Sequence, residues 1–124
     1  MPRHAITEFG RKEEGDLEES EGLPPLADGH VLPPDLLAFY RTCGGLTLRR
    51  ERVRIVPPGA FLCVGGTRYV LAEGTDARRP VPTVHIDLDR ERRGRCYAGA
   101  LEPPIAPSFT SFLTRLAYDG VYWR

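Results

Sequence analysis

The sequence has no long hydrophobic run. Within its 124 residues, no apolar stretch approaches the ~20 residues that a membrane-spanning helix needs. The opening residues, MPRHAITEFGRKEEG, lack the apolar core and the small-residue cleavage site of a secretion signal. We therefore expect a cytoplasmic protein with no membrane partner.

Cysteine is scarce, and no motif for nucleophilic catalysis is present. The three cysteines, Cys43, Cys63 and Cys96, are widely spaced among apolar residues, and we expect three buried, reduced thiols. A G-x-S-x-G nucleophile elbow is absent. Cys96 and His85 are the one candidate for a catalytic Cys/His pair. Strand alternation leaves open whether these two residues share a face of the sheet. We predict no catalytic residues and no enzymatic activity.

The chain also lacks a complete metal motif. His85, Asp87 and Asp89 alternate along one strand, but residues two apart lie about 6–7 Å from each other, which is long for one ion. A calcium loop beginning at Asp87 would need glycine and glutamate where Arg92 and Ala98 stand. We predict no metal and no cofactor.

Charge is balanced overall but unevenly distributed. Residues 1–30 hold eight acidic and three basic residues, whereas the remainder holds nine acidic residues and fourteen arginines. Arginines cluster over residues 49–54 and 90–95, yet Glu51, Asp89 and Glu91 interrupt both clusters. A phosphate backbone favours an uninterrupted basic strip. We therefore expect a protein partner and no nucleic acid.

Two amphipathic helices are predicted near the middle and the end of the chain. The first covers residues 34–43, where prolines begin the helix and Gly44-Gly45 ends it through a left-handed cap. The second begins near Pro107-Ser108 and ends at Asp119-Gly120. Their apolar and aromatic residues fall on helical stripes and are predicted to be core: Leu36, Leu37, Phe39, Tyr40, Phe109, Phe112, Leu113 and Leu116.

Alternating residues between the helices predict several short strands, over residues 52–56, 61–64, 68–72, 82–88 and 95–98. Gly65-Gly66 is a plausible hairpin turn. The short connections favour an α+β fold, a mainly antiparallel sheet with helices packed on one face. The opposite face would carry the candidate protein-binding residues Arg52, Arg54, Thr83, His85 and Asp87.

Residues 1–31 show no sustained apolar period and are interpreted as an acidic, partly flexible arm before a domain over residues 32–124. We expect the first ten or so residues to be mobile. A short helix over residues 16–22, with Leu17 inward, is plausible within this arm.

The order of motifs resembles the SUKH superfamily of bacterial immunity proteins and yeast cell-wall-assembly regulators. The resemblance covers residues 32–124 and includes an opening LPPDL helix that ends in a glycine pair, with Cys43 where the family often has asparagine. It continues through a strand pair and a closing helix, at Val84-His85-Ile86-Asp87, Gly94-Arg95-Cys96-Tyr97, Ile105-Ala106, Ser108-Phe109, Phe112-Leu113 and Tyr122-Trp123.

This resemblance implies a twisted-sheet α+β domain that binds a protein and has no catalytic set. The implied role is an immunity protein that neutralises a cognate toxin, often a nuclease, in a bacterial polymorphic toxin system. The alternative is an intracellular regulatory or scaffold domain of the cell-wall-assembly type, without a toxin partner. A small enzyme or small-molecule binder is a third class, and it would require a deep pocket with clustered, shifted ionisable groups.

Overall fold

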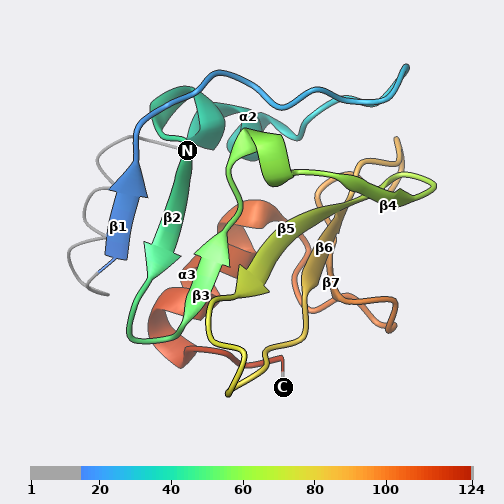
Figure 1. Ribbon diagram of the computed structural model, residues 1–124. Helices are drawn as coiled ribbons and strands as arrows, with labels where there is room; N and C mark the ends of the chain where they lie inside the picture. Colours follow the sequence, from blue (N-terminus) through green and yellow to red (C-terminus); the bar gives the residue numbers. More distant parts are fainter. Residues whose placement is uncertain (1–14, 124) are drawn as a thin grey trace.

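The computed structural model describes residues 15–123, and for Gly15 and Asp16 it describes the backbone alone. This part of the chain forms two α-helices, a short 3₁₀ helix and a seven-stranded sheet in which every strand pair is antiparallel (Figure 1). The predicted α+β class is confirmed. In chain order the elements are β1 Gly15–Glu18, α2 Pro34–Thr42, β2 Gly45–Leu48, β3 Val53–Ile55, η1 Pro58–Ala60, β4 Cys63–Gly65, β5 Arg68–Gly74, β6 Val84–Asp87, β7 Cys96–Ala98 and α3 Phe109–Asp119.

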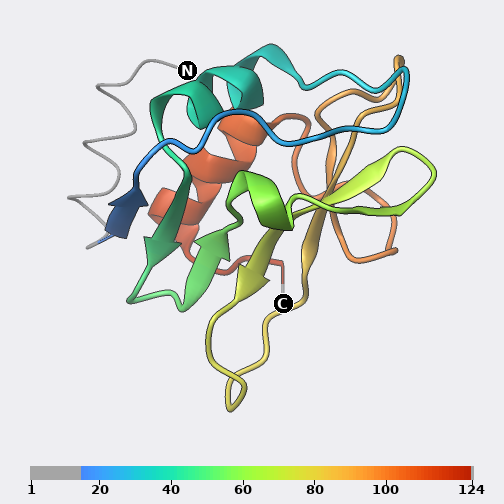
Figure 2. The same cartoon turned by 45° about the horizontal axis from the view of Figure 1, so that its top comes forward.

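The sheet follows the order β1-β2-β3-β5-β6-β7, with β4 also paired to β5. Strand β5 is the longest, and β3 and β4 pair with different parts of it. Ile55 of β3 pairs with Ala72 near one end, and Cys63 of β4 pairs with Tyr69 near the other. The β4–β5 hairpin therefore extends beyond the body of the sheet, as Figures 1 and 2 show.

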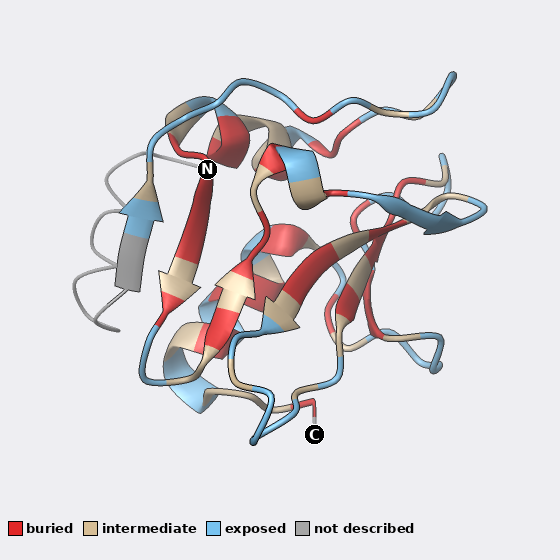
Figure 3. Ribbon diagram, in the orientation of Figure 1, coloured by how far each residue is buried: buried red, intermediate tan, exposed pale blue. Residues whose placement is uncertain are grey.

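The two helices supply most of the aromatic core. Helix α3 crosses behind the strands in Figure 1, and α2 packs against it with the Phe39 and Phe109 ring centroids 5.1 Å apart. Asp35 joins their N-terminal ends, because its Oδ2 accepts hydrogen bonds from both the backbone N–H and the hydroxyl of Thr110, each at 2.9 Å. Alternate strand residues face the helices and are buried (Figure 3), including Leu46, Leu48, Val53, Ile55, Val84 and Ile86.

The glycines after α2 have a different role from the one predicted. The helix ends at Thr42, and the next residue, Cys43, is extended, with φ −151° and ψ 164°. Gly44 then donates its N–H to the Glu18 carbonyl at 2.8 Å, and a Cβ on Gly44 would overlap the Glu19 carbonyl oxygen. The predicted left-handed cap was wrong. Gly44 instead allows the backbone of the N-terminal segment to approach closely.

Strands β1 and β2 were not predicted from the sequence. The helix predicted over residues 16–22 is wrong, since Gly15–Glu18 is strand β1, and Leu17 pairs with Leu46 of β2 and is 38% exposed. The division at residue 31 stays a prediction, although this pairing brings β1 into the sheet. The expected mobility of the first ten residues lies outside the described residues.

The three cysteines are free but do not share one environment. Cys43 and Cys96 are buried, whereas Cys63 of β4 is exposed, so the prediction of three buried thiols was wrong for Cys63. All three residues of β4 are exposed because this edge strand lies outside the helix-covered core. Burial raises the pKa of the Cys43 and Cys96 thiols, which keeps both protonated near neutral pH.

Candidate functional site

One side of the sheet is turned away from both helices, and we call it the open face. Cross-strand pairs place Arg54 between Thr47 and Glu73, and His85 between Val70 and Tyr97. Because directly paired residues share a face and alternate residues return to it, these side chains lie opposite the core. The open face thus comprises Thr47, Arg54, Arg68, Val70, Glu73, His85, Asp87 and Tyr97.

Three of the five predicted site residues, Arg54, His85 and Asp87, lie on the open face. Thr83 directly precedes β6 and is half-buried, in alternation with His85. Arg52 does not share the face, because β3 begins one residue later. It sits in the preceding turn at a φ of 57°, with its Nε 3.6 Å from Asp76 Oδ2.

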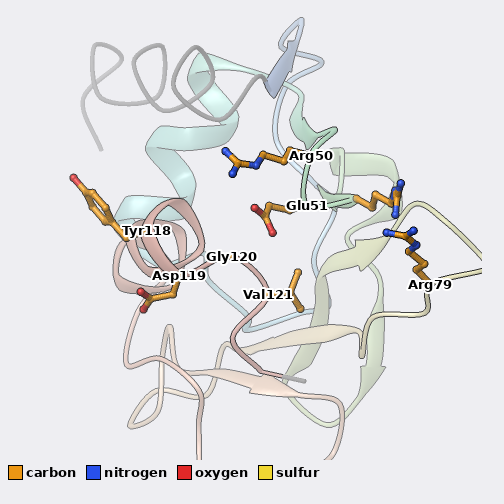
Figure 4. A pocket seen from close by; sticks show the side chains of 8 residues that line it. Arg50, Glu51, Arg79, Tyr118, Asp119, Gly120 and Val121 are labelled. Atoms are coloured by element: carbon orange, nitrogen blue, oxygen red, sulfur yellow. The ribbon is translucent and has the colours of Figure 1, made fainter.

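Arg52 belongs instead to an arginine-lined hollow at one end of the sheet. The hollow has a volume of about 400 Å³ and is surrounded by the β2–β3 turn, the loop after β5 and the end of α3 (Figure 4). Its carboxylates, Glu51 and Asp119, partly offset the arginines Arg50, Arg52 and Arg79. With both charge signs present, the hollow lacks a strong preference for anions.

Asp87 is the buried centre of a polar network on the open face. Only 1% of the residue is exposed. Its Oδ1 accepts hydrogen bonds from the Thr67 hydroxyl at 2.5 Å and from the Asp89 N–H at 2.8 Å. Its Oδ2 lies 3.6 Å from Nε of Arg68 and 3.4 Å from Nε of Arg92. Asp87 therefore acts on the surface by positioning two arginines and has no accessible area of its own.

Arg68 is the most strongly positioned cation of the open face, and the sequence analysis missed it. Its guanidinium carbon lies 3.7 Å from the ring centroid of Tyr97, which is 2% exposed. Its Nη2 donates to Glu102 Oε1 at 2.7 Å. The hydrogen bond that Arg68 donates to Glu102 is the main reason that the pKa of Arg68 is raised. The alternation in Arg68-Tyr69-Val70 was visible in the sequence. The partners of Arg68 could not be predicted, because Asp87, Tyr97 and Glu102 come from three separate segments.

Exposed apolar side chains accompany Arg68 on the β4–β5 hairpin. Val70 donates its N–H to the Leu62 carbonyl at 2.9 Å, so Leu62 lies across from Val70 and shares its side of the hairpin. The pairing register shifts between Cys63 and Gly65, and Gly65 pairs with Arg68, so Val64 lies in this bulge, next to the Gly65–Arg68 pair. Leu62 is 58% exposed and Val64 is 50% exposed. We call Leu62, Val64, Arg68 and Val70 the hairpin patch. Such a gathering of exposed apolar area on a small domain is typical of an interaction surface.

His85 adds a titratable group whose charge the surroundings disfavour. Burial, followed by the charge of Arg68, lowers its pKa, while a hydrogen bond with the Gly99 backbone acts in the opposite direction. The neutral imidazole is therefore favoured in the folded state. Protonation favours the unfolded chain, in which the pKa is about 6.5.

Stability should consequently fall as the pH drops below about 6.5, the unfolded-state value. We expect the wild type to lose more stability than His85→Gln between pH 7.5 and pH 5.0, measured by urea unfolding. Because both proteins share every other titrating group, the difference between them isolates the imidazole. Parallel pH curves for the two proteins would contradict the assignment.

The geometry also bears on the other chemistries considered. His85 pairs with Tyr97 while Cys96 pairs with Ile86, so the imidazole and the thiol lie on opposite faces and form no catalytic pair. Within residues 15–123 there is no group of three or more His, Cys, Asp or Glu placed to hold a metal ion. The described helices are also too short or too polar to cross a membrane.

Comparison with known proteins identifies a relative that covers most of the chain. The chain is 31% identical to "Immunity protein YokJ" of Bacillus subtilis (strain 168) over 132 aligned residues, which cover 86% of this chain and 78% of that protein. The chain belongs to the YokJ immunity-protein family. No protein-family model matches it, and no solved structure matches it, so the SUKH resemblance stays a prediction. For a member of the YokJ family, a surface that contacts another protein is the feature of most interest, and the hairpin patch is the strongest candidate.

Proposed function

We propose that this protein is an immunity protein that binds a cognate toxin through the hairpin patch and the adjoining open face, and so blocks the toxin sterically. Membership of the YokJ family supports the immunity role. The observation that carries the binding site is the exposed Leu62 and Val64 beside an arginine that is already held in place. Catalysis has no part in this mechanism.

The patch has the composition of a protein-binding centre. Interface centres combine apolar side chains with arginine or aromatic anchors, and a polar rim surrounds them. Leu62, Val64 and Val70 supply apolar area, and Arg68 supplies the anchor. The predicted residues Arg54, Thr83 and His85 would form the rim, while Asp87 would position Arg68. A stable complex of this kind buries roughly 1,600 Å² in total.

The class of toxin follows from the SUKH resemblance and from charge. The resemblance implies that the toxin is often a nuclease, and nucleases carry basic surface to hold phosphates. The eight acidic and three basic residues of positions 1–30 give this chain a complementary acidic segment. We therefore propose a nuclease as the toxin, with the hairpin patch making the apolar contacts and the acidic segment contributing long-range attraction.

A single substitution with a matched control tests the binding site. Leu62→Asp places a charge in the centre of the patch and should weaken binding of the cognate toxin domain, identified by testing toxins encoded near this gene, by at least about 30-fold, roughly 2 kcal/mol. Isothermal titration calorimetry measures the affinity, and survival of toxin-expressing cells measures protection. Tyr118→Asp alters another large exposed side chain, 71% exposed on α3, which covers the other side of the sheet, and should leave both unchanged.

Two outcomes would count against the proposal. Full affinity in Leu62→Asp would remove the hairpin patch as the binding site while keeping the immunity role. Failure of the wild-type protein to bind or protect would remove the immunity role. It would then favour the regulatory or scaffold alternative, in which gene deletion alters cell-wall or stress phenotypes without any effect on toxin survival.

A further inference from the structure

Arg68 has two kinds of partner, which differ in how firmly they are fixed. Asp87 and Tyr97 are buried, and each is anchored by a paired strand, β6 or β7. Glu102 is different: its side chain is 62% exposed, it lies in the loop that follows β7, and its one ion pair with a described residue is with Arg68. The two buried groups therefore fix the guanidinium, and the exposed carboxylate only occupies its outer edge.

The outer edge of Arg68 is built to receive a carboxylate. A guanidinium presents several N–H donors in one plane, which suits a carboxylate better than any other protein group. Glu102 demonstrates this fit with its 2.7 Å contact to Nη2. The side chain of Arg68 is 23% exposed, so its remaining accessible surface is directed at solvent or at a partner.

The neighbourhood of this edge would strengthen an incoming ion pair. Leu62 lies on the same side of the hairpin as Arg68, and Val64 lies in the bulge next to the Gly65–Arg68 pair. The exclusion of water by apolar contacts increases the attraction between opposite charges. Charged contacts inside such an apolar ring are the ones that contribute most to binding. The ion pair with Glu102, in contrast, is open to water and screened.

We propose that the toxin presents an aspartate or glutamate, flanked by apolar side chains, and that its carboxylate replaces Glu102 on Arg68 when the complex forms. Glu102 is then an internal stand-in that competes with the toxin. This inference rests on the proposed immunity function and names the chemistry of the partner surface at the same site. A partner surface without a carboxylate opposite Arg68 is incompatible with it.

Three variants and a control test the exchange, with affinities for the same cognate toxin domain measured by calorimetry at low salt. Arg68→Gln should weaken binding by about tenfold or more, in the range of a lost anchor. Glu102→Gln should tighten binding severalfold, because the internal competitor is lost. In the Arg68→Gln background, Glu102→Gln should have no effect. Arg92→Gln alters the other arginine beside Asp87 and should change the affinity less than twofold.

The outcomes separate this inference from the function on which it rests. If Arg68→Gln binds the toxin as tightly as the wild type does, the carboxylate exchange is overturned and the immunity role is kept. Weaker binding by Glu102→Gln would also overturn it, since Glu102 would then contact the toxin itself. Absence of wild-type binding would overturn both. Thermal melts of each variant, together with Arg68→Lys, which keeps the charge, show whether a loss of affinity reflects a loss of fold.

Discussion

Gly44→Ala is expected to lower the free energy of unfolding by about 3 kcal/mol, the upper part of the usual cost of overpacking. The added methyl group would overlap the carbonyl oxygen of Glu19, which is a backbone atom and cannot rotate away. Relief requires the N-terminal segment to move. That movement would break the hydrogen bond from Gly44 N–H to the Glu18 carbonyl and disturb the β1–β2 ladder.

Gly59→Ala provides the matched control for this substitution. Gly59 is exposed, its φ lies outside the left-handed region that favours glycine, and no atom lies within 4 Å of an added Cβ. Alanine there should change stability by no more than about 0.5 kcal/mol, because it mainly restricts the unfolded chain. Urea unfolding of both variants gives the comparison. Equal midpoints for Gly44→Ala and the wild type would show that the backbone contact at Glu19 is absent in solution.

Asp87→Ala should have an effect of similar size, about 3 kcal/mol, because a buried acceptor that serves several donors is lost at once. The Thr67 hydroxyl and the Asp89 N–H would lose their acceptor, and Arg68 and Arg92 would face each other without the intervening carboxylate. Most of the loss comes from the hydrogen bonds. The arginines are 23% and 49% exposed, so solvent screens the ion pairs.

Two further variants sharpen the test of Asp87. Asp87→Asn keeps an acceptor for Thr67 and should cost about half as much, since the lost charge is partly screened. Glu102→Gln removes an exposed partner of Arg68 and should change stability by less than about 1 kcal/mol. Guanidinium-induced unfolding, followed by tryptophan fluorescence, measures the free energy of unfolding of all three variants. An Asp87→Ala protein within about 1 kcal/mol of the wild type would contradict the network.

The elements with strong apolar periodicity could be predicted from the sequence. Helices α2 and α3 are amphipathic, and their prolines and the Ser108 cap mark where they begin; Ser108 Oγ does accept the Ser111 N–H at 3.1 Å. Strand β2 carried the same kind of pattern in Leu46-Thr47-Leu48, and this alternation was overlooked. Strand β1 offered almost no pattern, since its only large apolar residue is Leu17. Its position depends on pairing with β2, which sequence periodicity does not encode.

The candidate site was predictable in part. Alternation in β6 placed His85 and Asp87 on the open face, and the register confirms their shared side. It could not show that Asp87 is buried, because Thr67, Arg68 and Arg92 reach it from other segments. It also could not exclude Arg52, whose place depends on where the turn ends. The exposure of Leu62 and Val64 follows from the extension of the hairpin beyond the sheet, which is a property of the three-dimensional arrangement alone.

The binding site that we propose on the projecting β4–β5 hairpin is separate from the core on which folding depends. No residue of β4 takes part in the buried core, so the side chains at positions 62 and 64 can vary without removing a contact on which the domain depends. Related chains with this architecture could thus acquire new partners by exchanging a few hairpin residues. The scaffold would remain intact through such changes, as diversification against successive toxins would require.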